Sequence, residues 1–227
     1  MPRSLIALTL LFAIAACDSS TLELPTEDPP AEDPNPSSPF YPLMVGNMWE
    51  YELRAATSCT TYSEVYGHRR LSVEEEVIAE GEHAYRVRTE LLDTAGDATH
   101  TWADTIRYDA ETSRVIEWRV PHGWEHEIPW YEAVCPFDAE PESVVECALD
   151  PYSVSESAGW EGEIGGTSIS GTWRRYGTGL TVNGWREYVE GIGLISFGEL
   201  YECVGERRDL RYAVVGDQEI GVSALGS

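Results

Sequence analysis

The strongest constraint on the fold is an alternation of apolar and polar side chains that recurs between residues 71 and 120. Val73 and Val77 alternate with glutamates, and after Gly81 the pattern resumes from Tyr85 onward. Side chains of a strand point alternately to the two faces of a sheet, whereas a helical face repeats every 3.6 residues. This segment is therefore predicted to form strands that share one apolar face.

Pairing the two runs about Gly81 places apolar residues on one face and opposite charges on the other, which fixes a register. The expected pairs are Val77 with Tyr85, Val73 with Thr89, and Leu71 with Leu91. Turns near residues 95–98 and 111–113 add two more strands. Their expected pairs are Leu91–Trp102, Val87–Ile106, Tyr85–Tyr108, Tyr108–Ile116 and Ile106–Trp118. The prediction is a four-stranded antiparallel meander.

Three polar residues interrupt the expected inner face: Glu75, Thr89 and Asp104. In the predicted register Thr89 faces Asp104, and Glu75 lies two strands away from Asp104, about 10 Å at 4.8 Å per strand. Two carboxylates at such a separation can perform acid–base work, as in inverting glycosidases. A glycan hydrolase is therefore one hypothesis. The alternative is that both residues lie near a wet rim and are unreactive.

The rest of the domain also favours strands. The candidates are Trp49–Leu53, Ile169–Tyr176, Trp185–Val189, Leu194–Tyr201 and Leu210–Val215. Residues 121–158 hold five prolines and show no regular alternation, so they are expected to form a long excursion, that is, an irregular segment between strands. The predicted fold is all-β, a single antiparallel curved sheet or open barrel spanning residues 43–217, followed by a tail at 218–227.

The amino-terminal segment has the features of an export signal. Residues 5–16 form an apolar run that is shorter than the roughly 20 residues needed to cross a bilayer. The sequence Ile14-Ala15-Ala16-Cys17 resembles the bacterial lipobox. The resemblance implies removal of residues 1–16 and attachment of diacylglycerol and a further fatty acid such as palmitate to the new terminus at Cys17. Two or three acyl chains anchor a protein stably. The alternative is an ordinary signal peptide followed by an incidental cysteine.

Residues 17–42 are expected to form a tether. After Cys17 this stretch holds seven of the thirteen prolines, six acidic residues and no basic residue, so it cannot bury enough apolar surface to fold. The domain is thus expected to stand off a bacterial cell membrane or outer membrane, in the periplasm or on the cell surface. The net charge of −25 excludes nucleic acid as a partner.

Four cysteines remain after lipidation, and an exported chain with an even number is expected to form disulfides. Three pairings are possible. We favour Cys135 with Cys147, which flank a proline-containing loop, and Cys59 with Cys203. No cysteine spacing is typical of a zinc site.

Two short segments resemble a group of exported bacterial β-proteins. Residues 42–51, Pro-Leu-Met-Val-Gly-Asn-Met-Trp-Glu-Tyr, are similar to the opening of their domains, and residues 191–195, Gly-Ile-Gly-Leu-Ile, are similar to a segment before their last two strands. The resemblance covers about fifteen residues. It implies a curved antiparallel sheet, similar to that of periplasmic lipid-carrier lipoproteins, and it transfers no catalytic residue.

Other motifs lead to no catalytic or metal site. His122 and His126 lack a third ligand, and Asp93 and Asp97 lack the further oxygens of a calcium loop. No serine lies in a nucleophile elbow, no lysine exists to complete a phosphate loop, and no cofactor is expected.

One loop combines aromatic side chains: Trp124, Trp130 and Tyr131. They are expected either to form a binding lip or to pack beneath the loop. The leading hypothesis is a non-enzymatic, membrane-tethered domain that binds an apolar ligand or an envelope protein. The candidate ligand contacts are these aromatic residues with Glu75 and Asp104. The alternatives are a structural assembly component and the glycan hydrolase.

Overall fold

The structure is a computed structural model, and it describes residues 38–79, 81–109, 111–119, 130–133, 136–147, 150–177 and 182–224. In chain order its strands are β1 (Met48–Ala55), β2 (Gly67–Ala79), β3 (Glu82–Leu92), β4 (Ala98–Asp109), β5 (Arg114–Arg119), β6 (Trp130–Ala133), β7 (Val144–Cys147), β8 (Asp150–Ile164), β9 (Thr167–Gly177), β10 (Val182–Val189), β11 (Gly193–Tyr201), β12 (Val204–Val215) and β13 (Gln218–Gly221). None of the described residues forms a helix long and apolar enough to span a bilayer.

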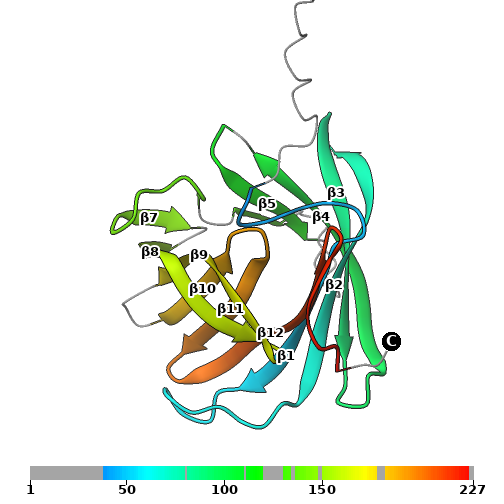
Figure 1. Cartoon of the computed structure of the whole chain (residues 1–227), viewed down its shortest axis with the longest axis vertical. Coiled ribbons are helices and arrows are strands. Elements are labelled where there is room, and N and C mark those ends of the chain that lie inside the picture. The colour runs from blue at the N-terminus through cyan, green and yellow to red at the C-terminus, as the bar shows by residue number, and fades with distance from the viewer. Residues whose placement is uncertain are drawn as a thin grey trace, which may run out of the picture. The chain divides into compact units, whose positions relative to one another are not determined.

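All thirteen strands belong to one curved antiparallel sheet (Figure 1). In each half of the sheet, β1 to β6 and β7 to β12, strands that are consecutive in the chain are neighbours in space. β1 pairs with β12 and so joins the two halves. β13 pairs with β12 at residues 212–215, beyond the part of β12 that pairs with β11. The described sheet ends at β6 and β7 and is not closed into a barrel, which confirms the predicted fold class.

The meander of β2 to β5 is confirmed, but its predicted registers are wrong. Next to the turn, Val77 pairs with Ala84 rather than Tyr85, a displacement of one residue. A β-bulge between Val73 and Glu75 adds a second residue to the displacement, so Val73 pairs with Val87 and Leu71 with Thr89. A bulge inserts an extra residue into one strand, so the side chains beyond it change face.

The next two pairs of strands are displaced as well. β3 and β4 are shifted by two residues, with Tyr85 opposite Ile106 and Val87 opposite Asp104. A shift of two residues leaves each side chain on its predicted face of the sheet. β4 and β5 are shifted by one residue, so Tyr108 lies opposite Val115 instead of Ile116. Because side chains alternate with period two, this shift moves Val115 to the inner face, where it is fully buried.

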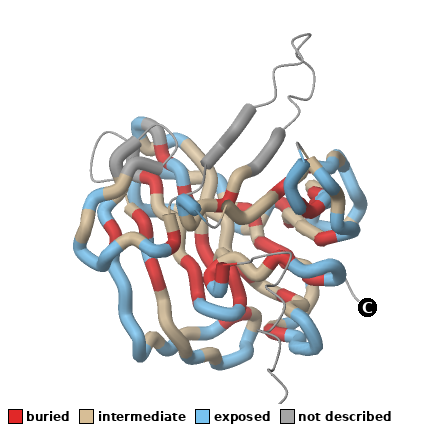
Figure 2. The backbone as a smooth tube through the Cα atoms, turned by 90° about the horizontal axis from the view of Figure 1, so that it is seen from above, coloured by how far each residue is buried: buried red, intermediate tan, exposed pale blue. Residues whose placement is uncertain are grey.

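The core lies on the concave side of the sheet, where Figure 2 shows the buried residues gathered inside the exposed outer surface. Phe40 and Phe137, which come from segments outside the strands, stack with centroids 6.1 Å apart. Phe137 also contacts Tyr188 edge-on, with centroids 5.0 Å apart. Phe40 and Ser38 are buried, so these two residues of the predicted 17–42 tether pack against the domain.

Two further boundaries differ from the prediction. The segment 121–158 is not one long excursion, because it contains β6, β7 and the start of β8. Residues 218–221 are not part of a tail, because they form β13 with Ile220 buried opposite Ala213. In both places the residues pair with a strand that is next to them in the chain, β6 with β5, β7 with β8 and β13 with β12, although their own pattern gives no strand signal.

Candidate functional site

Glu75 and Asp104 do not lie together. The bulge in β2 turns Glu75 outward, where its side chain is 51% exposed and forms an ion pair with Arg86. Asp104 is buried on the inner face and accepts a hydrogen bond from Trp102 Nε1 at 2.8 Å. The predicted carboxylate pair is therefore wrong, because two groups on opposite faces of a sheet cannot flank one bond of a substrate.

The residue opposite Asp104 is Val87, and Thr89 instead faces Trp102. Thr89 is 1% exposed, and its Oγ1 makes no hydrogen bond with any described residue. The inner face of β3 and β4 thus carries two buried polar side chains next to the Trp102 ring.

The other predicted residues are only partly described. Trp124, His122, His126 and Cys135 lie outside the described residues. Trp130 and Tyr131 lie in the edge strand β6, and Cys147 in β7, but their side chains are not described. Whether the aromatic residues form a lip, and whether Cys135 pairs with Cys147, therefore stay predictions.

The Asp93–Asp97 turn has the geometry of a polar hairpin turn. Asp93 Oδ1 accepts hydrogen bonds from the backbone N–H groups of Ala95 and Asp97, at 2.9 and 3.0 Å. This carboxylate therefore stabilises its own turn by accepting hydrogen bonds from the turn's backbone. Within the described part of the chain, no group of three or more His, Cys, Asp or Glu side chains is placed to hold a metal ion.

A disulfide joins Cys59 to Cys203, the predicted pairing. Cys59 lies in the loop between β1 and β2, and Cys203 lies in the turn between β11 and β12. Glu202 and Cys203 both have positive φ, 47° and 68°. Such angles fit a tight two-residue hairpin turn but are unfavourable for side chains other than glycine and asparagine. The disulfide holds the β1–β2 loop against this turn.

The two segments that carry the family resemblance meet in the structure. Trp49 Nε1 donates a hydrogen bond to the Ile192 carbonyl at 2.7 Å, and the Tyr51 hydroxyl donates to the Leu194 carbonyl at 2.9 Å. A Cβ atom at Gly193 would lie only 3.3 Å from Trp49 Nε1, so glycine permits the approach. These segments form a structural contact between β1 and β11, which do not pair directly.

A group of arginine and aromatic side chains, absent from the sequence predictions, interrupts the core face. In one row across the sheet, Arg208 faces Leu53 and Phe197, and Phe197 faces Arg186. Arg186 in turn faces Tyr176, which is 0% exposed. Directly opposite residues of antiparallel strands share a face, so these arginines point to the side of the sheet that holds the core.

We name this group the arginine–aromatic cluster; it comprises Arg69, Trp102, Arg186, Phe197 and Arg208. The guanidinium carbons of Arg208 and Arg186 lie 4.9 and 5.5 Å from the centre of the Phe197 ring. Arg69 faces Tyr51 and lies 5.7 Å from the Trp102 ring centre. These distances are typical of cation–π contacts.

The arginines of the cluster lower the pKa of a carboxylate at its edge, Glu206. Glu206 forms an ion pair with Arg208 and accepts a hydrogen bond from the Tyr66 hydroxyl. Burial by itself would raise the pKa of Glu206, but Arg208, the Tyr66 hydroxyl and Arg69 together hold the pKa below its ordinary value. Burial, with the hydrogen bond to Glu206, raises the pKa of Tyr66 to about 12. The cluster therefore favours a carboxylate in its ionised form.

The alternation of residues contains a signal for this cluster. Arg208 lies two residues before the buried Leu210, and Arg186 two residues before the buried Tyr188, so each arginine falls on the inner side of its strand. Arginine offers five N–H donors in a planar fork that fits carboxylates and phosphates. The arrangement can therefore bind an acidic group while the neighbouring rings contact an apolar body.

The chain matches no protein-family model and no curated protein. Two solved structures align with it. One is described as an exported protein with a YmcC-like fold from Bacteroides fragilis, with a TM-score of 0.49, 10% identity, and coverage of 77% of this chain and 98% of that chain. The other is described as a lipoprotein from Parabacteroides distasonis, with a TM-score of 0.41, 9% identity and the same coverage, 77% and 98%. Likeness at this level assigns neither a family nor a ligand to this chain.

Proposed function

We propose that this protein is a cell-envelope lipoprotein, anchored through lipid on Cys17, whose β domain binds an apolar ligand that carries an acidic group. The anchor rests on the lipobox-like segment and the proline-rich tether, since Cys17 lies outside the described residues. The anchor places the domain at a bacterial cell membrane or outer membrane, in the periplasm or on the cell surface.

The observation that carries the ligand hypothesis is the arginine–aromatic cluster on the core face. Arginine is rarely found on an apolar face, because removing a charge from water is costly, and Arg208 is stabilised there by its ion pair with Glu206. Here Arg208 and Arg186 occupy the same row as Leu53 and Tyr176. An acidic ligand group would add charge-assisted hydrogen bonds, each contributing about 1.5–3 kcal/mol.

The overall charge does not oppose such binding at short range. The chain carries a net charge of −25, which repels anions over long distances. At physiological ionic strength, however, the screening length is about 8 Å, so contacts within the cluster determine affinity. An apolar tail would additionally gain about 25 cal/mol for each Å² removed from water.

The test compares two ligands with the same tail. The detergent-solubilised lipoprotein is titrated with a long-chain fatty acid and with the corresponding fatty alcohol, and bound ligand is counted by native mass spectrometry. We expect the acid to bind at least tenfold more tightly, and Arg186→Gln to remove this preference, since about 1.4 kcal/mol corresponds to tenfold. Arg88→Gln is the matched control, because Arg88 lies on the outer face of β3 and is 45% exposed.

Equal binding of acid and alcohol, or an unchanged preference in Arg186→Gln, would overturn the ligand hypothesis. The anchor is tested separately by the intact mass of the protein extracted from membranes. Acyl chains on Cys17 would support the anchor, and an unmodified terminus elsewhere in the chain would contradict it.

One observation favours a second candidate, a structural envelope component without a ligand. Phe137 packs on Tyr188 and Tyr176, and Phe40 stacks on Phe137, so the chain itself fills that part of the concave face. Cross-linking in cells would support this candidate if it captured reproducible protein neighbours while no lipid copurified. No contact among the described residues favours the hydrolase, since Glu75 and Asp104 lie on opposite faces.

A further inference from the structure

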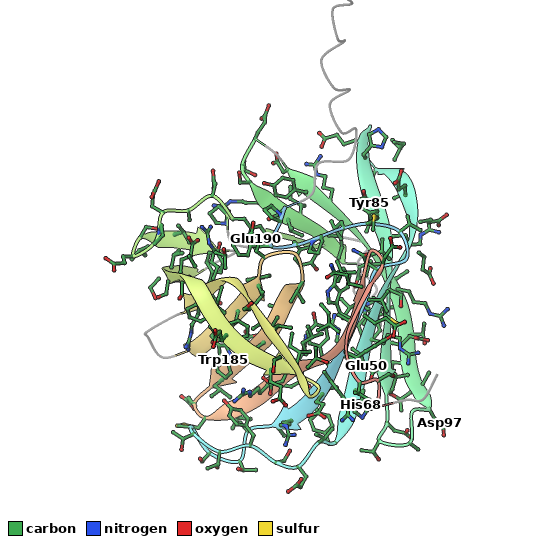
Figure 3. The ribbon with its side chains drawn as sticks, viewed as in Figure 1. Glu50, His68, Tyr85, Asp97, Trp185 and Glu190 are labelled. Atoms are coloured by element: carbon green, nitrogen blue, oxygen red, sulfur yellow. A yellow bond between two sulfur atoms is a disulfide. The ribbon has the colours of Figure 1, made fainter. Side chains whose placement is uncertain are left out.

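The outer face of the sheet carries a second aromatic site, centred on Trp185 of β10 (labelled in Figure 3). Trp185 lies directly opposite Gly198 of β11. A Cβ atom at Gly198 would come within 2.1–2.5 Å of three atoms of the indole ring. The ring therefore lies flat on the backbone of β11, and only a residue without a side chain permits this position.

The flat indole leaves one ring face directed away from the sheet. Trp185 is half-buried, and Tyr62 meets it edge-on, with centroids 6.5 Å apart at 74°. Tyr62 comes from the β1–β2 loop that the Cys59–Cys203 disulfide fixes to the β11–β12 turn. The guanidinium carbon of Arg207 lies over the Tyr62 ring, 5.4 Å from its centre.

Polar side chains border the indole on neighbouring strands. Trp185 Nε1 donates to Ser196 Oγ at 3.3 Å, and Ser196 Oγ donates to Asp209 Oδ1 at 3.0 Å. Arg207 pairs with Asp209 at 2.7 Å. In the same row Glu187 faces Ser196, with Arg175 3.5 Å away. We name the group the Trp185 patch; it comprises Tyr62, Trp185, Glu187, Ser196, Arg207 and Asp209.

The chemistry of the patch indicates the kind of ligand. The carboxylates of Glu187 and Asp209 are balanced by Arg175 and Arg207, so the surface around the indole has little net charge. It offers hydrogen-bond donors and acceptors beside a flat apolar plane. A sugar ring has the complementary form, because its C–H groups gather on one face and its hydroxyls, which both donate and accept, lie around its edge.

We propose that the Trp185 patch binds a sugar ring of a glycan chain. The ring stacks on the indole of Trp185, and its hydroxyls bond to Asp209 and Arg207, while the buried Ser196 links the indole to Asp209. The patch lies on the face opposite to the arginine–aromatic cluster, so glycan binding does not depend on the acidic ligand proposed above. A domain held at the membrane by its tether would then contact a polysaccharide of the envelope through its outer face.

The chain offers a control for this site. Trp160 in β8 also lies over a glycine, since a Cβ at Gly162 would come within 2.2 Å of its ring. Trp160 packs against the hydrophobic core and does not belong to the Trp185 patch. If loss of any indole that covers a glycine reduced retention, Trp160→Ala would reduce it as well, so a loss confined to Trp185→Ala indicates glycan recognition.

The experiment measures retention of the full-length lipoprotein, in detergent, in native gels cast with soluble glycans and on two insoluble ones. The probes are soluble cellulose ether, soluble chitin ether and dextran in the gels, and peptidoglycan sacculi and cellulose by sedimentation. We expect retention by at least one glycan, weakened about tenfold or more in Trp185→Ala and unchanged in Trp160→Ala. Tyr62→Ala, which alters an exposed loop and not the sheet, is expected to weaken the same glycan, and circular dichroism checks that each variant is folded.

Retention by none of these glycans overturns the proposal. So does unchanged retention in folded Trp185→Ala and Tyr62→Ala, or an equal loss in Trp160→Ala. If Trp185→Ala does not fold, Tyr62→Ala with Trp185→Phe decides the question, since a smaller ring on the same sheet should weaken binding and not abolish it. Loss of fatty-acid binding in Arg186→Gln with glycan retention intact would separate the two sites.

Discussion

Replacing Trp49 by phenylalanine removes the indole N–H that donates to the Ile192 carbonyl, while an aromatic ring still fills the core. Trp49 is 5% exposed and the hydrogen bond is 2.7 Å long. A lost hydrogen bond costs about 1 kcal/mol, and a buried carbonyl without a donor costs about 1–3 kcal/mol. We therefore expect the free energy of unfolding to fall by about 2 kcal/mol, or about 4–8 °C in Tm for a domain of this size.

The measurement is urea unfolding followed by circular dichroism, with Trp173→Phe as the control. Trp173 is half-buried, and its indole makes no hydrogen bond among the described residues, so this variant reports the loss of ring volume alone. Tyr51→Phe, which removes the bond to the Leu194 carbonyl at 2.9 Å, is expected to cost about 1 kcal/mol.

Because both donors hold the same short segment, the double variant Trp49→Phe with Tyr51→Phe should cost less than the sum of the single variants. If Trp49→Phe were no more destabilising than Trp173→Phe, the hydrogen bond from Trp49 to the Ile192 carbonyl would not stabilise the fold. Strict additivity in the double variant would show that the two hydrogen bonds act independently.

Three further predictions concern other parts of the fold. Because Cys59 and Cys203 are 144 residues apart, Cys203→Ser should lower the free energy of unfolding by an amount on the order of 5 kcal/mol, and an unchanged urea midpoint would contradict this. Glu206→Gln should be less stable than the wild type at pH 7, because the pKa of Glu206 is lowered in the folded protein. The ionised carboxylate stabilises the fold above the ordinary pKa of 4.5, and this stabilisation is lost as the pH falls through the lowered value. The unfolding curves of the two proteins should therefore converge in acid. Phe137→Ala should cost about 3–5 kcal/mol and make the segment around Phe40 more sensitive to limited proteolysis, whereas a loss below 1 kcal/mol would show that this contact is not part of the core.

The prediction of strands from the sequence succeeded because alternation is a local property. Each strand of the meander and the strands from β9 to β12 can be recognised from a few neighbouring residues, whatever they pair with. The Cys59–Cys203 pairing was also predictable, since an exported chain with few cysteines allows few combinations. The assignment of Glu75 to the inner face failed because no local feature marks the extra residue at Glu74 that produces the bulge in β2.

Only the tertiary structure decided where the candidate sites lie. Register depends on bulges and turn lengths, and a shift of one residue moves every side chain of a strand to the other face. The pairing of β1 with β12 joins residues about 160 positions apart, and it places Arg208 beside Leu53. Arg69 and Arg186 reach the same face through four other pairings. The residue pattern can place each arginine on the inner side of its own strand, but only long-range pairing brings three of them into one cluster.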